Sequence, residues 1–194
     1  MLVCFVLLGS QPTARASDFG VLVEPSLVLG AAKWSERSVY TDTDTGAPKS
    51  TYDRHPYVGF GSEFGLALGA YLGDHVQLAG YARIGLAGHP EGFRVRPAHA
   101  GALGLQLTLS QHADRGVYAT LRGGLALMQE HHGFSAGMEL GYAWQVADAW
   151  YLGLGLASAL EQVDYREDGD WGFYDIRSRL IAGGVSLRVR YREP

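Results

Sequence analysis

The segment Tyr151 to Leu160, YLGLGLASAL, alternates between large and small side chains along its length. Its leucines fall on one side of the alternation, and its glycines and alanines fall on the other. Successive side chains of a β-strand point to opposite faces, so this period of two predicts a strand with one bulky face. Two further segments repeat the pattern. The large residues of the three segments are Leu152, Leu154, Leu156 and Leu160; Leu103, Leu105, Leu107 and Leu109; and Ile181, Val185, Leu187, Val189 and Tyr191.

The same alternation, followed outward along the chain, predicts eight strands. Most of them exceed the ~5–6 residues of soluble strands and reach the ~9–11 that cross a bilayer at a tilt. Short connections are expected at 73–74, 111–116 and 147–150, and long polar loops at 33–55 and 164–178. Short turns at one end and longer loops at the other are typical of outer-membrane barrels. The expected strands are 19–31, 56–72, 75–88, 94–110, 117–130, 134–146, 151–163 and 179–191.

Composition agrees with an all-β chain. Glycine supplies 27 of the 194 residues, about twice the usual ~7 %. No apolar run approaches the ~20 residues of a transmembrane helix. Only Lys33 and Lys49 are lysines, and no basic cluster suggests nucleic-acid binding. An apolar run from Leu2 to Leu8, followed by Ala14-Arg15-Ala16, predicts a signal peptide over residues 1–16 and one mature domain over 17–194.

The face opposite the leucines decides which side of the sheet is the inside. It consists mainly of glycine and alanine with a few charges, which would coat a water-exposed surface poorly. Inside a narrow eight-stranded barrel, where only packed side chains fit, small residues are required. This predicts an eight-stranded antiparallel up-and-down transmembrane β-barrel with a polar lumen. The charges assigned to the lumen are Glu24, Glu63, Arg83, Arg94, Arg96, Arg122, Glu139, Arg188 and Arg190.

Lone charges in such an interior are costly, so these groups are expected to pair. A tight turn at Gly73 would bring Glu63 close to Arg83. A turn near His132 would bring Arg122 close to Glu139. Closure of the barrel would bring Glu24 close to Arg188. The sequence therefore predicts a lumen plugged by a charge network.

The outward face also carries aromatic residues near the strand ends, as expected where a barrel meets the two membrane interfaces. This supports the assignment of faces, although soluble sheets share the feature. The residues are Phe19, Phe60, Phe93, Phe134, Trp144 and Tyr191, with Trp34, Tyr57 and Trp150 at the boundaries.

With these features the chain resembles the small bacterial outer-membrane β-barrel families represented by the OmpA membrane domain and OmpX. The resemblance lies in the signal-like start, the strand number, the loop asymmetry and the last strand containing Tyr191, and it includes no diagnostic motif. It departs at Arg192-Glu193-Pro194, where members often end on an aromatic residue. The resemblance implies the outer membrane of a Gram-negative bacterium, a monomer, and contacts with outer-membrane lipids and the barrel-insertion machinery.

The expected function is a structural or surface-interaction role. An extracellular ligand is expected at the loop 164–175, whose aromatic residues are Tyr165, Trp171, Phe173 and Tyr174. Three alternatives remain: a narrow porin-like channel, a lipid-modifying enzyme of the outer membrane, and a soluble ligand-binding barrel.

No catalytic or metal-binding constellation is complete in this sequence. Ser62 and His99 share the outward face and could serve a lipid hydrolase as nucleophile and base, but they lie on non-adjacent strands without a carboxylate. The histidines at 55, 89, 131 and 132 lack the spacing of a metal site. The segment Asp42 to Gly46 departs from a calcium loop in the position of its glycine. No enzyme activity, metal or cofactor is therefore predicted.

Overall fold

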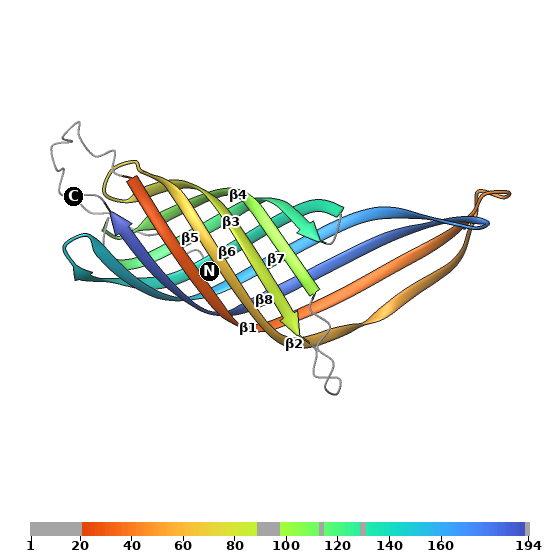
Figure 1. Cartoon of the computed structure of the whole chain (residues 1–194), viewed down its shortest axis with the longest axis horizontal. Coiled ribbons are helices and arrows are strands. Elements are labelled where there is room, and N and C mark those ends of the chain that lie inside the picture. Colours follow the sequence, from red (N-terminus) through yellow and green to blue (C-terminus); the bar gives the residue numbers. More distant parts are fainter. Residues whose placement is uncertain (1–20, 89–97, 113–114, 129–130, 193–194) are drawn as a thin grey trace, which may run out of the picture.

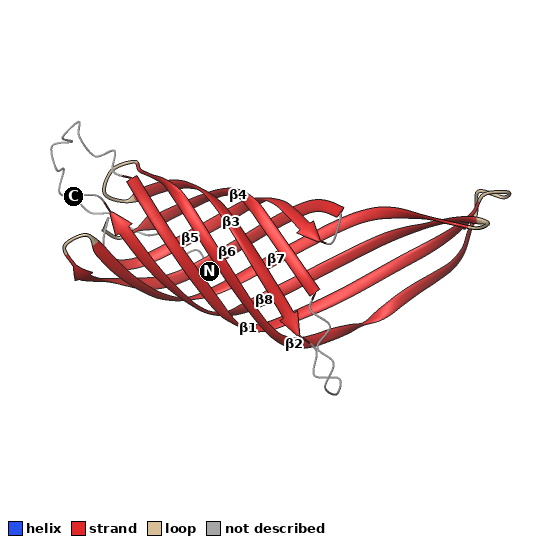
Figure 2. Cartoon of the chain, in the orientation of Figure 1, coloured by secondary structure: helices blue, strands red, loops and turns tan. Residues whose placement is uncertain are grey.

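The computed structural model describes residues 21–88, 98–112, 115–128 and 131–192. The expected signal peptide, residues 1–16, lies outside this part, as do Phe19, Phe93, Arg94 and Arg96. All regular structure in the described residues is β-strand (Figure 2). These residues contain no helix that is long and apolar enough to cross a membrane. The strands are β1 Val21–Asp42, β2 Pro48–Tyr71, β3 Val76–Gly88, β4 Ala98–Ser110, β5 Gly116–Met128, β6 His131–Ala147, β7 Trp150–Gly169 and β8 Gly172–Arg192.

Each strand pairs antiparallel with the next, and β1 pairs with β8, so the sheet closes into a barrel (Figure 1). The predicted antiparallel up-and-down arrangement is confirmed. The tight turn after β2 contains Gly73, with φ 93°, and the connection after β4 ends at Gly116, the first residue of β5, with φ 98°; both glycines are in the left-handed region. A side chain at either position would be strained, so these glycines make the short connections possible.

The prediction of long polar loops at 33–55 and 164–178 was wrong, because both segments are mostly strand. β1 and β2 continue to a turn at 43–47, and β7 and β8 continue to a turn at 170–171. The paired extensions of the four strands, residues 33–59 and 163–178, form a sheet here called the blade. It projects beyond the ends of the other four strands (Figure 1). Apolar residues do not alternate regularly in the blade, so the sequence pattern gave no sign of strands there. These strands are held by backbone hydrogen bonds to their neighbours.

The tip of the blade is held by local side-chain bonds. The Asp42 carboxylate accepts hydrogen bonds from the backbone N–H groups of Asp44, at 2.7 Å, and Thr45, at 3.3 Å. It also binds the Lys49 ammonium. Asp side chains commonly stabilise turns in this way. The Thr43 N–H donates to the Trp171 carbonyl at 3.3 Å, which ties the two turns of the blade together.

The barrel is inverted relative to a soluble one, since its large apolar side chains point outward. Leu156 is 69 % exposed, while Glu24, Glu139 and Arg188 on the other face are at most 2 % exposed. This matches the face assignment made from the alternation. The outward apolar side chains form a continuous surface, here called the apolar belt, that includes Leu29, Phe60, Phe64, Leu68, Ile84, Leu105, Leu121, Phe134, Met138, Leu140, Leu156, Ile181 and Val185.

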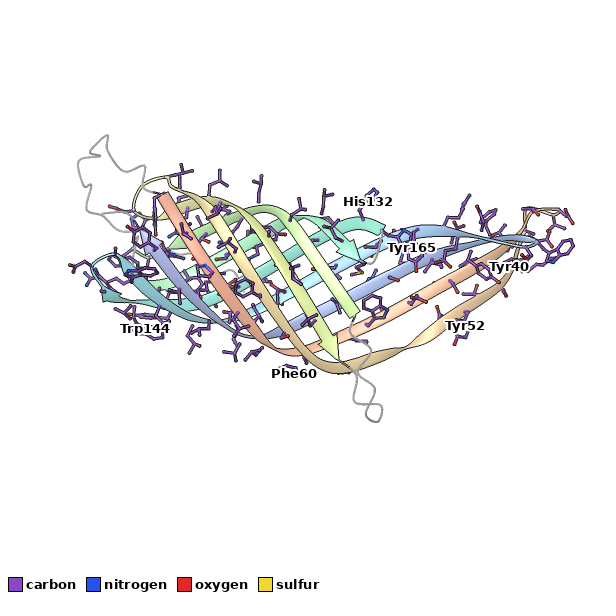
Figure 3. All side chains as sticks on the ribbon, in the orientation of Figure 1. Tyr40, Tyr52, Phe60, His132, Trp144 and Tyr165 are labelled. Atoms are coloured by element: carbon purple, nitrogen blue, oxygen red, sulfur yellow. The ribbon has the colours of Figure 1, made fainter. Side chains whose placement is uncertain are left out.

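Aromatic residues lie at both ends of the apolar belt. Trp144 is exposed at the short-turn end, whereas Phe60 lies where the blade begins (Figure 3). Trp150 is exposed at the start of β7, after the short connection from β6. Phe134 is exposed on β6 near the blade. Trp34 was expected among the outward aromatic residues at the boundary, and this prediction was wrong, because Trp34 packs against a buried cluster in the lumen. The side chain of Tyr57 lies outside the described residues.

Barrel closure depends on glycine where β1 meets β8. Gly30 pairs directly with Gly184. A Cβ atom added at Gly30 would lie 2.5 Å from the Gly184 Cα atom and closer still to the Gly183 carbonyl oxygen. These are backbone atoms of the neighbouring strand, so only a shift of the seam could relieve the clash.

Substitution of Gly30 by valine is therefore expected to destabilise the barrel by about 1–3 kcal/mol, the range for overpacking. Gly123→Val is the matched control, because a Cβ atom at Gly123 has nothing within 4 Å. Urea unfolding of the refolded proteins would measure both effects. Equal stability of the two variants would mean that β1 and β8 do not approach this closely.

Candidate functional site

The centre of the lumen holds a network of charged side chains to which all eight strands contribute. Alternation along each strand turns one of every two residues inward, and tilt brings the inward residues of successive strands to a common level. The members, in strand order, are Glu24, Glu63, Arg83, Gln106, Arg122, Glu139, Glu161, and Arg188 with Arg190.

Glu139 is the most heavily bonded carboxylate of the network. It accepts hydrogen bonds from the Tyr118 hydroxyl at 2.7 Å and the Ser186 hydroxyl at 2.7 Å. It also forms ion pairs with Arg122 Nη2, at 3.0 Å, and with Arg188. Both of its oxygens are thus occupied, and its side chain is fully buried. Four donors from two other strands, β5 and β8, converge on this one residue.

A second carboxylate, Glu24, holds the short-turn side of the network. It accepts from Arg188 Nη1 at 2.8 Å, Arg190 Nε at 2.8 Å and Gln106 Nε2 at 3.0 Å. The Gln106 carbonyl oxygen in turn accepts from Arg122 Nε at 2.9 Å. Arg188 and Gln106 therefore link Glu24 to the bonds around Glu139.

Arg83 binds the two carboxylates nearest the blade. Its Nη1 lies 3.0 Å from Glu63, and its Nη2 lies 2.8 Å from Glu161 and 2.9 Å from the Ser135 hydroxyl. Arg122 Nη1 lies 3.9 Å from Glu63, which connects this group to the rest. The network is continuous from Glu24 to Glu161.

The network contains four glutamates and four arginines, so their formal charges sum to zero. Transfer of single charges from water into such an interior would cost several kcal/mol each. Mutual pairing with additional hydrogen bonds offsets most of that cost. The arrangement is chemically suited to closing the lumen with fixed, mutually neutralised side chains.

Apolar clusters lie on both sides of the network. Leu22, Tyr71 and Tyr81 belong to a cluster at the short-turn end. Met128 and Leu180 belong to a cluster at the blade end, against which Trp34 and Tyr165 pack. Between this second cluster and the network lies a cavity of about 30 Å³, bordered by Glu63, Arg83, Arg122 and Glu161 and by glycine and alanine walls. Apolar side chains therefore lie on both sides of the charge network in the described part of the lumen.

The three acid–base pairs expected from hairpin geometry and closure are present as ion pairs. Their N–O distances are 3.0 Å for Arg83–Glu63, 3.0 Å for Arg122–Glu139 and 2.8 Å for Arg188–Glu24. Arg190, also expected in the lumen, pairs with Glu24. The links from Arg188 to Glu139 and from Arg83 to Glu161 join strands that are not neighbours, and sequence reasoning did not find them.

Glu161, Tyr118 and Gln106 were not recognised as members of the network. Glu161 has the same parity on β7 as Gly153 and Gly155, so the alternation contained a usable signal for it. Gln106 likewise alternates with Leu105 and Leu107. The contacts of Glu161 with Arg83 and of Gln106 with Glu24 join non-neighbouring strands across the lumen, at distances that no sequence pattern encodes. The bonds from Tyr118 to Glu139 and from Arg122 to Gln106 join neighbouring strands.

The four aromatic residues expected to form one loop site are not brought together, and only Trp171 lies in a turn. Tyr165 is in β7, where its ring stacks on His131 at 3.8 Å at the mouth of the lumen. Tyr174 is in β8 and contacts Tyr40 at 4.9 Å. Phe173 has the opposite parity and lies under the Arg166 guanidinium at 3.9 Å. Tyr40, Tyr52 and Tyr165 all lie on the blade side of the barrel (Figure 3). The correction follows from the blade being paired strand.

The residues considered for other chemistry remain apart. Ser62 pairs with Leu86 of β3, and Leu86 pairs with His99 of β4, so a full strand separates Ser62 from His99. The side chains of His55, His89 and His99 lie outside the described residues. Within the described ranges, no group of three or more His, Cys, Asp or Glu side chains is arranged to hold a metal ion.

No protein-family model and no curated protein matches the sequence. Similar chain paths occur in solved structures of low sequence identity. The outer membrane protein AlkL, solved by solid-state NMR in DMPC bilayers, is 11 % identical over 97 % of both chains, with a TM-score of 0.46. Neisserial surface protein A is 14 % identical over 88 % of this chain and 96 % of its own, with a TM-score of 0.41. The outer membrane protease OmpT from Escherichia coli is 10 % identical over 93 % and 99 %, with a TM-score of 0.44. The function of this chain is therefore inferred from its own geometry.

Proposed function

We propose that this protein is an outer-membrane barrel of a Gram-negative bacterium, with a sealed lumen and a blade that makes contacts at the cell surface. The observation that carries the proposal is the inversion of the barrel: leucine faces outward and arginine faces inward. Soluble proteins rarely expose contiguous apolar patches of more than a few hundred Å². If the apolar belt lies in contact with lipid hydrocarbon, its apolar side chains are not exposed to water. Closure of the sheet leaves the barrel itself without an unpaired strand edge, as a membrane span requires.

The dimensions of the apolar belt support a membrane span. On β6, exposed aromatic residues stand at Phe134 and Trp144. The segment between them rises about 33 Å along the strand, or about 25 Å along the axis at a tilt of about 40°. The apolar band of outer-membrane barrels is about 25 Å tall. The blade lies beyond this band and would stand in water.

Membrane insertion is tested with the refolded full-length chain and phosphatidylcholine vesicles. We expect the protein to float with the vesicles through a density gradient and to run as a compact band that shifts on boiling. A chain that stays soluble without detergent and does not float would disprove the proposed location. It would instead favour a soluble barrel with a ligand in its lumen.

The lumen is proposed to be a plug rather than a pore. Planar-bilayer recordings are expected to show no steady conductance for the wild-type protein. Glu63→Ala is also expected to stay closed, because the apolar clusters around Tyr71 and Met128 lie on either side of the network. Stable ohmic conductance of the wild type would contradict the plugged lumen and favour the narrow channel instead.

The surface role is assigned to the blade, and we propose no catalytic role. Trp171 is 79 % exposed at the tip, and Tyr52 is 64 % exposed. Exposed aromatic residues are the side chains that most often anchor interfaces. If the blade carries the contacts, Trp171→Ala is expected to weaken attachment of the protein to a cell-surface ligand without changing the boiling shift. Unchanged attachment of the Trp171→Ala variant would show that Trp171 is not part of the contact surface.

A further inference from the structure

Lys33 stands where β1 leaves the apolar belt and enters the blade. Its neighbours in the same outward row are Val58 on β2 and Ile181 on β8. Both are exposed, at 61 % and 47 %, so an exposed lysine interrupts an apolar row. Lysine at such a level extends its ammonium toward the water while its stem covers apolar surface. Its charge is therefore placed at the boundary between hydrocarbon and water.

Arg179 adds a second charge beside Lys33. It pairs with Ser35, two residues along β1 from Lys33, which makes the two cations diagonal neighbours on adjacent strands. Diagonal side chains of an antiparallel pair lie about 7–8 Å apart, so two long side chains in these positions can both contact the same ligand group. The bond that Arg179 makes is to the neutral Gln162 amide oxygen, at 2.9 Å. Its charge is not neutralised by that contact.

The acidic groups nearby do not neutralise this pair. Asp53 and Asp164, one row further out, pair with Arg37 and Arg177. Glu36 has the opposite parity and accepts from the Ser178 hydroxyl on the lumen side. In the part of the chain that the structure describes, no carboxylate lies within ion-pair distance of Lys33 or Arg179.

We propose that Lys33 and Arg179 bind the phosphate of an anionic lipid headgroup in the leaflet on the blade side. The inference deepens the proposed function and rests on the membrane location proposed there. Guanidinium presents a planar fork to two phosphate oxygens, and ammonium adds a compact charge. Basic residues beside a membrane attract anionic headgroups. Headgroup phosphates lie at the edge of the hydrocarbon, and Lys33 is at the edge of the apolar belt.

The test compares two double variants of the full-length chain refolded in a phosphocholine detergent. The probe is short-chain phosphatidic acid, titrated and followed by native mass spectrometry. Lys33→Gln/Arg179→Gln is expected to bind it about thirty-fold more weakly than the wild type, because each cation near a membrane surface contributes about fivefold. Lys49→Gln/Arg166→Gln removes the same charge from the outer half of the blade and is expected to bind like the wild type.

Equal affinity of the two double variants would overturn the inference, and so would inorganic phosphate that competes as well as the lipid. The compact band before boiling shows that each variant is folded. Flotation with phosphatidylcholine vesicles tests the membrane location separately. A wild-type chain that floats but shows no preference for phosphatidic acid would overturn only the headgroup site, whereas a chain that does not float would overturn the proposed function.

Discussion

Replacement of Glu139 by alanine is expected to lower the free energy of unfolding by about 3–5 kcal/mol, the cost of removing one partner from a buried ion pair. The loss leaves Arg122 without its 3.0 Å partner and removes one of the two carboxylates that Arg188 binds. It also leaves the Tyr118 and Ser186 hydroxyls without their acceptor. Urea titration of the vesicle-inserted barrel, followed by tryptophan fluorescence, would measure the change.

Two comparisons make this result specific to the network. Glu167→Ala removes an exposed carboxylate of the blade and is expected to change stability by less than about 0.5 kcal/mol. Glu24→Ala combined with Glu139→Ala is expected to be non-additive, because both carboxylates bind Arg188. If Glu139→Ala matched the Glu167→Ala control, the lumen would be hydrated and the bonds around Glu139 would contribute little.

Substitution of Leu156 by arginine is expected to cost about 2–4 kcal/mol in a bilayer, the range for arginine on the lipid face near the midplane. Leu156 is 69 % exposed and stands between Leu140 and Val185 in the apolar belt. Its partner Leu140 lies about midway between Phe134 and Trp144 on β6. A soluble barrel would place the same position in water, where a surface substitution changes stability by about 0.5 kcal/mol or less.

The matched control for Leu156→Arg is Thr51→Arg, at an exposed position of the blade. It is expected to leave stability in vesicles unchanged, because the proposed orientation places the blade in water. Reversible unfolding of both variants in the same vesicles would give the difference. A neutral Leu156→Arg together with a costly Thr51→Arg would mean that the blade, and not the apolar belt, contacts lipid.

The sequence pattern was sufficient for the barrel and insufficient for the blade. Strands β3 to β6 lie close to their expected bounds because leucine alternates with small residues along them, and burial on one face makes that alternation necessary. In the blade both faces are polar or aromatic, as at Arg37, Ser38 and Tyr40. Alternation carries no signal there, so the paired strand segments at 33–42, 48–55, 164–169 and 172–178 were expected to be loops.

In the candidate site, contacts between neighbouring strands could be predicted from the sequence, whereas contacts across the lumen could not. Hairpin turns and closure of the ring were enough to predict the partners of Glu63, Glu139 and Glu24, since each expected partner lies on a neighbouring strand. The bonds from Arg188 to Glu139 and from Arg83 to Glu161 cross the lumen. Their formation depends on the tilt of the strands and the barrel diameter, which set the level of every inward residue.

The sequence by itself thus determined the strand type, the number of strands, the inward and outward faces, and the acidic and basic residues that share the interior. These follow from a period of two and from the cost of unpaired charge. Only the tertiary structure decided that four strands extend into a blade and that Glu139 is the centre of the network. It also decided that Lys33 and Arg179 are diagonal neighbours on adjacent strands at the edge of the apolar belt. The physical reason is that strand register and tilt bring together side chains that are distant in sequence, and neither is encoded in the local alternation of residues.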